Sequence, residues 1–270
     1  DDWDYQQNHF YYAFHLDGTS FFSSSFALNQ AFQPDSDYNT PRTLQFRFKT
    51  PGIPINSSYY NIWAGNETTA FITLDYTGPG MSSGSYSGSV PSESNAYGTL
   101  TLYPDGLNDT NKTASLYLPF FDGGWWSVMM VHDGTDPSTP DPVTLYAANS
   151  IDGKIGFTGS SETTHNHQYW ESITKSYFPL TSGLSVNGTF YSPLTGALQE
   201  IRYWENNLDI SVFHDYVLNP FSTQGNTINS APEDLAFRAP LGTTIDTNYH
   251  NLVYYGSNLT SIHPKVTGSW

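Results

Sequence analysis

The feature that most constrains this chain is a short alternation of apolar and polar residues that recurs along most of its length. Within residues 43–49, Leu44, Phe46 and Phe48 fall on one face of an extended segment, and Gln45 and Arg47 fall on the other. Clusters of Gly, Pro, Asn and Ser separate such segments about every ten residues. Many short strands with this spacing predict an all-β sandwich or barrel.

Other segments repeat the alternation, and the stretches between them predict the loops and one helix. Strands are predicted over residues 59–63, 70–76, 97–103, 115–120, 126–132, 143–148, 155–158 and 198–204. A Gly- and Ser-rich stretch over residues 78–89 predicts a long surface loop. One short helix is predicted over residues 209–218, with Ile210, Phe213 and Val217 on its buried stripe and Tyr216 as a further candidate.

Charge and composition exclude several classes of function. The chain has 9 Lys and Arg against 25 Asp and Glu, a formal charge of −16, so we expect no nucleic-acid partner and no attraction to anionic membranes. It has no cysteine, which excludes disulfides, a thiolate nucleophile and cysteine-ligated metals. No apolar run approaches the roughly 18 residues of a membrane span. Because the chain starts with Asp1 and lacks a signal-peptide pattern, we expect a processed product or a piece of something longer.

Several segments together resemble a known family. Residues 124–134, with their Gly-Trp strand and Asp-Gly turn, lead into the Leu-Tyr strand of residues 143–149. Residues 190–208 resemble a closing strand that leads into a short helix, and residues 14–22 resemble an opening hairpin. In order and spacing, these segments are similar to laminin-G-like modules of the concanavalin A-like lectin and glucanase superfamily.

The resemblance implies an all-β, two-sheet antiparallel jelly-roll sandwich with one short helix. We expect the domain to span residues 1–220 and an irregular C-terminal arm, or the start of a following module, to span residues 221–270. That arm resembles the segment that follows laminin-G-like modules in large structural proteins of marine viruses. The implied setting is the surface of a virion.

The predicted core follows from the alternation. Two registers fit residues 125–130, with either Trp125 or Trp126 facing inward; strict alternation favours Trp126. Leu198 and Ile201 are an odd number of positions apart, so a bulge or strand end must lie between them if both face the core. The residues expected in the core are Leu44, Phe46, Phe48, Trp126, Val128, Leu145, Leu198, Ile201 and Tyr203.

Catalytic carboxylates of the glucanase kind are missing from the sequence. Those enzymes place two carboxylates across the sugar ring, one as nucleophile and one as general acid. The most similar spacing here is Glu200 and Glu205, which fall on opposite faces of one strand. We interpret Glu200 beside Arg202 as an exposed same-face pair, and we expect no enzymatic activity.

A rim loop offers oxygen ligands for calcium, the cofactor that some members of the superfamily bind. Asp133 and Asp136 are our preferred ligands, with Asp141 in the same loop. Asp105, Asn108 and Asp109 form a second candidate loop. The alternative is that these residues serve turn geometry alone, since Asp is common beside Gly and Pro in turns.

Two histidines and two aromatic residues follow closely in the sequence. His165 and His167 share one face of an extended segment and could bind a transition metal in a threefold assembly; the alternative is a solvent-exposed loop. Tyr169 and Trp170 could form an aromatic platform for a sugar ring, or pack beneath the loop. These four residues are the candidate ligand-binding positions.

Three functions from different classes remain. The first is a non-catalytic structural or adhesion module of a virion surface or fibre protein, which binds neighbouring protein subunits and a host glycan. The second is a secreted carbohydrate-binding domain, with calcium as a candidate cofactor and no cofactor assigned. The third is a glycan-cleaving enzyme, which the missing carboxylate pair disfavours.

Overall fold

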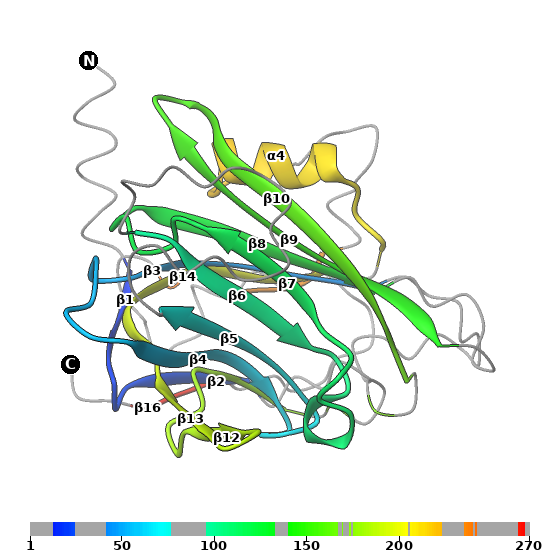
Figure 1. Ribbon diagram of the computed structural model, residues 1–270. Helices are drawn as coiled ribbons and strands as arrows, with labels where there is room; N and C mark the ends of the chain where they lie inside the picture. Colours follow the sequence, from blue (N-terminus) through cyan, green and yellow to red (C-terminus); the bar gives the residue numbers. More distant parts are fainter. Residues whose placement is uncertain are drawn as a thin grey trace.

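Two β-sheets packed face to face form the body of the molecule in the computed structural model (Figure 1). The structure describes residues 13–24, 42–76, 96–132, 140–166, 169, 173, 175–204, 206–222, 235–239, 241 and 264–267. The predicted loop over residues 78–89 and most of the predicted arm therefore lie outside the described residues. Where neighbouring strands pair, they are antiparallel with one exception, so the predicted antiparallel jelly-roll sandwich is confirmed.

The first sheet has the strand order β1-β14-β3-β8-β9-β10, with β15 also paired to β14. Its strands are β1 (Phe14–Asp17), β3 (Arg42–Lys49), β8 (Trp125–His132), β9 (Asp141–Ile151), β10 (Lys154–His165), β14 (Thr195–Trp204) and β15 (Leu235–Ala239). Because β8, β9 and β10 are neighbours in both sequence and space, side chains near their ends meet at one end of this sheet.

The second sheet has the strand order β16-β2-β11-β4-β5-β6-β7. Its strands are β2 (Phe21–Ser24), β4 (Ser58–Gly65), β5 (Ala70–Tyr76), β6 (Gly98–Tyr103), β7 (Ala114–Leu118), β11 (Ser176–Phe178) and β16 (Pro264–Thr267). A hairpin of β12 (Leu184–Val186) and β13 (Thr189–Pro193) joins it through a parallel pairing of β13 with β4. A short 3-10 turn, η1 (Gly106–Asn108), follows β6.

The core between the sheets is the predicted one. All nine expected residues are buried and belong to one cluster: Leu44, Phe46, Phe48, Trp126, Val128, Leu145, Leu198, Ile201 and Tyr203. Trp126 faces inward, while Trp125 stays half-buried on the other face, so the strict-alternation register is confirmed.

A bulge in β14 reconciles Leu198 with Ile201. The pairing of β14 with β3 shifts between Gln199 and Arg202, and Glu200 has a left-handed φ of 51°. Both apolar residues therefore face the core, as predicted. The same bulge sends Glu200 and Arg202 to the opposite face of the sheet.

The single long helix of the described residues is α4 (Ile210–Leu218), which packs on the outer side of the first sheet against β8, β9 and β10 (Figure 1). Its buried residues are Val212, Phe213, Tyr216 and Val217. Ile210 is 45% exposed, so its predicted place on the buried stripe is wrong. Val212 lies on the buried stripe instead. No helix in the described part of the chain has the length and apolar character to cross a membrane.

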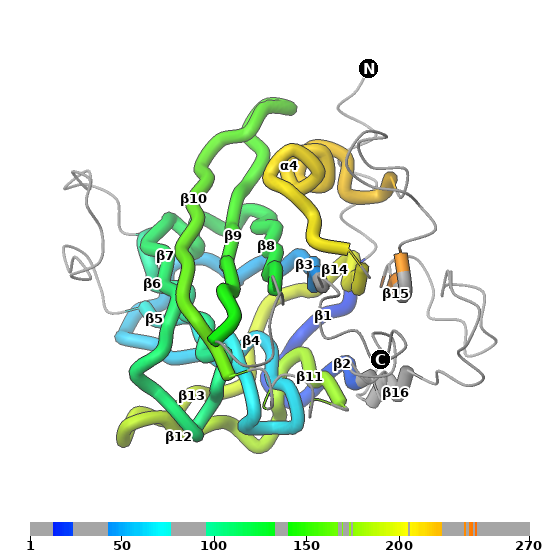
Figure 2. Tube along the Cα trace, turned by 90° about the vertical axis from the view of Figure 1, so that its right-hand side faces the viewer, coloured from blue at the N-terminus to red at the C-terminus, as the bar shows by residue number. Residues whose placement is uncertain are grey.

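Two segments of the predicted arm pair with the sandwich. Figure 2 shows β15 beside β14, and Figure 1 shows β16 beside β2. β15 pairs with the end of β14 that follows the bulge, where Ile201 lies opposite Ala239 and Arg202 opposite Arg238. The chain after residue 222 thus contributes strands to both sheets.

Candidate functional site

A small polar pocket lies between α4 and the outer face of the first sheet. Its volume is about 230 Å³. Gln45, Arg202 and Trp204 line it from the sheet, Val212, Asp215 and Tyr216 line it from the helix, and Asn219 and Ser222 line it from the turn that follows the helix. The residues from the sheet are buried, whereas Asn219 and Ser222 are exposed, so the last two mark its mouth.

Arg202, which lines this pocket, belongs to a cluster of arginines. Glu200 is fully buried and accepts hydrogen bonds from Arg202 at 2.8 and 3.2 Å. It also accepts two from Arg238, with Nε at 2.9 Å and Nη2 at 2.8 Å. The prediction of an exposed Glu200–Arg202 pair is wrong, because α4 and β15 cover this face of β14.

Arg47 extends the cluster along β3. Its side chain is 8% exposed, donates from Nη1 to Gln199 at 3.4 Å and lies 5.3 Å from the ring centroid of Trp125. Burial lowers the pKa of Arg47. Its Nε makes no hydrogen bond with the described residues. Three of the four arginines in the chain, Arg47, Arg202 and Arg238, therefore gather on this face.

Aromatic side chains fix the walls of the pocket. The Tyr216 hydroxyl donates to the backbone carbonyl of Glu200 at 2.8 Å, and the Arg202 guanidinium lies 4.8 Å from the Tyr216 ring centroid. Burial raises the pKa of Tyr216, which keeps it a hydrogen-bond donor. Trp204 donates from its indole nitrogen to Gln45 at 2.9 Å.

The arginine cluster behind the pocket carries more positive than negative charge. Its three guanidinium groups lie near one buried carboxylate, Glu200, while the pocket lining itself holds one arginine, Arg202, and one carboxylate, Asp215. Arg202 also donates from Nη2 to the carbonyl of Pro220, and its Nη1 takes part in none of these bonds. The arrangement suits a small ligand that carries both hydroxyl groups and a negative charge.

A second cluster lies at the ends of β8, β9 and β10. His132, Asp141 and His165 are buried, with 0%, 1% and 0% of each residue exposed. Nε2 of His132 is 3.4 Å from Oδ2 of Asp141, and the two imidazole centroids are 4.3 Å apart at an interplanar angle of 66°. One ligand atom from each residue lies within 4.8 Å of the other two.

The structure describes two of the predicted ligand-binding residues, His165 and Tyr169. His165 is buried at the end of β10, so the interpretation of an exposed loop is wrong for this residue. Tyr169 is half-buried, and its backbone N–H donates to the carbonyl of Asn166. Four predicted positions lie outside the described residues: Asp133, Asp136, His167 and Trp170.

The second predicted calcium loop is held by other contacts. Asp105 is fully buried, accepts from Nζ of Lys112 at 2.9 Å and accepts from the backbone N–H of Asn166 at 2.7 Å. Asp109 accepts from the backbone N–H of Asn111 at 3.1 Å, as in an Asx turn. Both carboxylates thus have protein partners in the structure.

Sequence reasoning identified His165 and Asp141 separately but not their partner or the pocket. His132 stood in the predicted strand 126–132, and alternation with Val128 and Met130 places it on the inward face. That inward polar residue at a strand end was the available signal. The arginine cluster gave no local signal, because Arg47, Arg202 and Arg238 lie on different strands.

Comparison with known proteins gives matches at the level of structure. No protein-family model matches the chain, and no curated protein matches it. A heptameric SAP-like pentraxin from Limulus polyphemus is 14% identical, with a TM-score of 0.35, over 93% of this chain and 97% of that one. Tailspike protein 2 of an Escherichia coli O157:H7 bacteriophage is 12% identical, with a TM-score of 0.43, over 76% of this chain and 24% of that one.

A third match is to botulinum neurotoxin type C, in a structure concerned with its interaction with two ganglioside molecules. It is 10% identical, with a TM-score of 0.41, over 78% of this chain and 45% of the toxin chain. Because identities and TM-scores are this low, the jelly-roll assignment rests on the strand order and pairing of the chain itself.

Proposed function

We propose that this chain is a non-catalytic carbohydrate-binding module that holds one acidic sugar residue in the pocket beneath α4. The observation that carries the proposal is a polar, aromatic pocket lined by Arg202, which belongs to a cluster of three arginines. Its volume of about 230 Å³ is below the roughly 300–1,000 Å³ of sites for drug-sized ligands, so it matches one sugar residue.

The side chains of the pocket match the chemistry of a sugar. Gln45, Asn219 and Asp215 offer planar groups that donate to or accept from vicinal hydroxyl groups. Tyr216 and Trp204 add aromatic surface for the C–H face of a ring. The Nη1 group of Arg202 would bind a sugar carboxylate, because a guanidinium matches the geometry of that group.

The absence of catalysis is part of the proposal. Hydrolysis would need two carboxylates roughly 5–10 Å apart across the bound sugar, one of which exchanges protons with it. Both oxygens of Glu200 already accept from arginine N–H groups. Asp215 is then the one carboxylate of the pocket lining left for a ligand.

Glycan-array and calorimetric titrations of the full chain test the proposal. We expect glycans that end in a uronic or sialic acid to bind, and their neutral counterparts to bind at least about 10-fold more weakly, as the loss of one charged hydrogen bond predicts. Equal binding of both kinds, or of neither, would overturn the proposal.

Two variants and a control tie the binding to the pocket. Asn219→Ala removes an exposed amide at the mouth and is expected to weaken binding about 10-fold. Asp215→Asn removes the one carboxylate of the lining and is expected to tighten binding of acidic glycans. Asn56→Ala changes an exposed amide outside the pocket lining and is expected to have no effect.

A more specific form of the proposal places the chain on a virion surface, where it contacts other protein subunits. The resemblance of residues 221–270 to viral module junctions supports it. Mass spectrometry of purified particles tests this placement. Absence of the chain from particles would favour the secreted carbohydrate-binding domain and leave the pocket proposal standing.

A further inference from the structure

The geometry points to a transition-metal site formed by His132, Asp141 and His165, with Zn²⁺ as the metal that suits it best. The site is independent of the pocket beneath α4, and it differs from the calcium loop predicted from the sequence in both its ligands and its metal. It would bind one ion per chain without any threefold symmetry.

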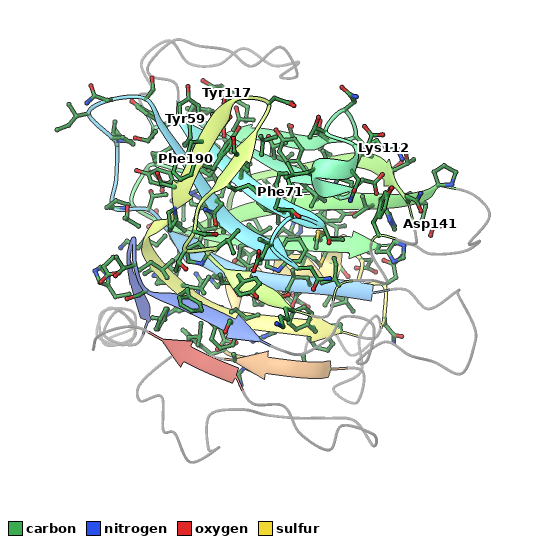
Figure 3. All side chains as sticks on the ribbon, turned by 90° about the horizontal axis from the view of Figure 1, so that it is seen from below. Tyr59, Phe71, Lys112, Tyr117, Asp141 and Phe190 are labelled. Carbon is green, nitrogen blue, oxygen red and sulfur yellow. The ribbon has the colours of Figure 1, made fainter. Side chains whose placement is uncertain are left out.

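The sheet brings the three residues together. Asp141 is the first residue of β9 and lies directly opposite His165, the last residue of β10. His132 is the last residue of β8 and lies opposite Val143, two residues along β9 from Asp141. Side chains two residues apart on a strand share a face, so all three reach the same side of the sheet. Figure 3 shows Asp141 at the end of the molecule away from Tyr59 and Phe190.

The distances approach those of a metal site. Tetrahedral zinc with ligands at about 2.0–2.1 Å sets its ligand atoms about 3.3 Å apart. The 3.4 Å between Nε2 of His132 and Oδ2 of Asp141 matches one such edge. All three ligand atoms lie within 4.8 Å of one another, so a bound ion would draw the more distant pair together by at most about 1.5 Å.

The burial of these groups favours a cation between them. A carboxylate and two imidazoles are held where at most 1% of each residue is exposed. The two imidazole rings lie with centroids 4.3 Å apart, and two positively charged imidazolium rings at that separation would repel each other. A divalent ion would bind both rings as neutral ligands and neutralise the buried carboxylate at the same time.

The ligand types select the metal. Imidazole nitrogens suit zinc and other first-row transition metals, whereas calcium takes six to eight oxygen ligands. Three protein ligands leave one position for water. A bound ion would join the end of β8, the start of β9 and the end of β10.

Metal titration of the full chain after dialysis against a chelator is the test. We expect one Zn²⁺ per chain by calorimetry, and visible absorption typical of tetrahedral coordination when Co²⁺ replaces zinc. His165→Ala and Asp141→Asn are each expected to weaken Zn²⁺ binding by more than about 100-fold, since even outer-shell changes cost 10–100-fold. His15→Ala removes an exposed histidine on β1 and should change nothing.

X-ray absorption of the zinc-loaded wild-type chain keeps the test independent of whether the variants fold. It should show two imidazole nitrogens near 2.0–2.1 Å together with oxygen ligands. The proposal is overturned if the wild-type chain binds no stoichiometric zinc, if the spectrum shows oxygen ligands alone, or if folded His165→Ala and Asp141→Asn variants retain the affinity. Calcium that raises the melting temperature as much as zinc would overturn it too.

Discussion

Glu200 and Arg238 are joined by two parallel hydrogen bonds, of 2.8 and 2.9 Å, although 38 residues separate them in the chain. Arg238 lies on β15, and Glu200 lies in the bulge of β14 to which β15 pairs. This pair of hydrogen bonds therefore holds a segment beyond residue 222 against the jelly roll. Arg202, which lines the pocket, donates to the same Glu200 carboxylate, so the Glu200–Arg238 pair is connected to the candidate site through Arg202.

We expect Glu200→Gln to destabilise the protein by about 3–5 kcal/mol, because three arginines would then lose their one fully buried carboxylate. The side chain keeps its size, so the loss reports charge rather than packing. Urea denaturation measures it. Glu162→Gln, which changes an exposed carboxylate on β10, serves as the control and should shift stability by less than about 0.5 kcal/mol. Equal effects of the two substitutions would show that Glu200 does not hold the cluster.

Local patterns were enough to predict the framework of this fold. Trp126 could be placed inward from its alternation with Val128 alone, and the spacing of Leu198 and Ile201 required the bulge that the structure shows. These predictions succeed because side-chain direction along a strand depends only on neighbouring residues. The helix at residue 210 was predicted for a similar reason, from its cap and its stop.

The sites depend on pairings between distant strands, and this is why sequence reasoning missed them. Glu200 looked exposed because nothing near it in sequence shows that α4 and β15 cover that face. His132 was not joined to His165, since only the order β8-β9-β10 brings the two rings together. A polar residue at an inward position of a strand was the one local clue.

We expect the stability of the protein to depend on pH through the carboxyl group of Asp75. Its carboxylate is half-buried on β5 and accepts from the Tyr191 hydroxyl at 3.4 Å, and burial raises its pKa from 3.8 to about 6. The folded protein thus holds this proton more tightly than the unfolded chain does. The stability that Asp75 contributes is present below pH 4 and is lost as the pH rises through 6.

Asp75→Asn should remove this dependence. At pH 8 we expect the variant to be more stable than the wild type by at most about 3 kcal/mol, from about two pKa units at 1.36 kcal/mol each, with no difference below pH 4. Urea denaturation at both pH values measures the difference. Asp152→Asn, an equal change of charge at an exposed turn, is the control. A variant that is less stable than the wild type at pH 8 would contradict the sign.

Asn61 fastens the β12–β13 hairpin to the second sheet. Its buried amide donates to the carbonyls of Leu180 and Tyr191, both at 3.2 Å, and accepts from the Leu180 N–H at 2.7 Å. Asn61→Ala removes all three bonds and is expected to cost about 2–4 kcal/mol, at roughly 1 kcal/mol per bond plus the unpaired backbone groups. Hydrogen exchange at the Leu180 amide should rise with the loss. If stability falls while that exchange is unchanged, the effect comes from another contact.

The N-terminus of α4 connects helix stability to the pocket. Oδ1 of Asp209 accepts from the backbone N–H of Ser211 at 2.7 Å and from that of Val212 at 3.3 Å, which caps the first turn. Asp209→Ala is expected to cost about 1 kcal/mol, and Asp209→Asn much less, because an amide oxygen can accept the same bonds. Since Val212 and Tyr216 line the pocket, a frayed helix should also weaken glycan binding in the alanine variant. Thermal melts and titrations of both variants test this; equal losses for alanine and asparagine would show that charge, and not capping, is the role of Asp209.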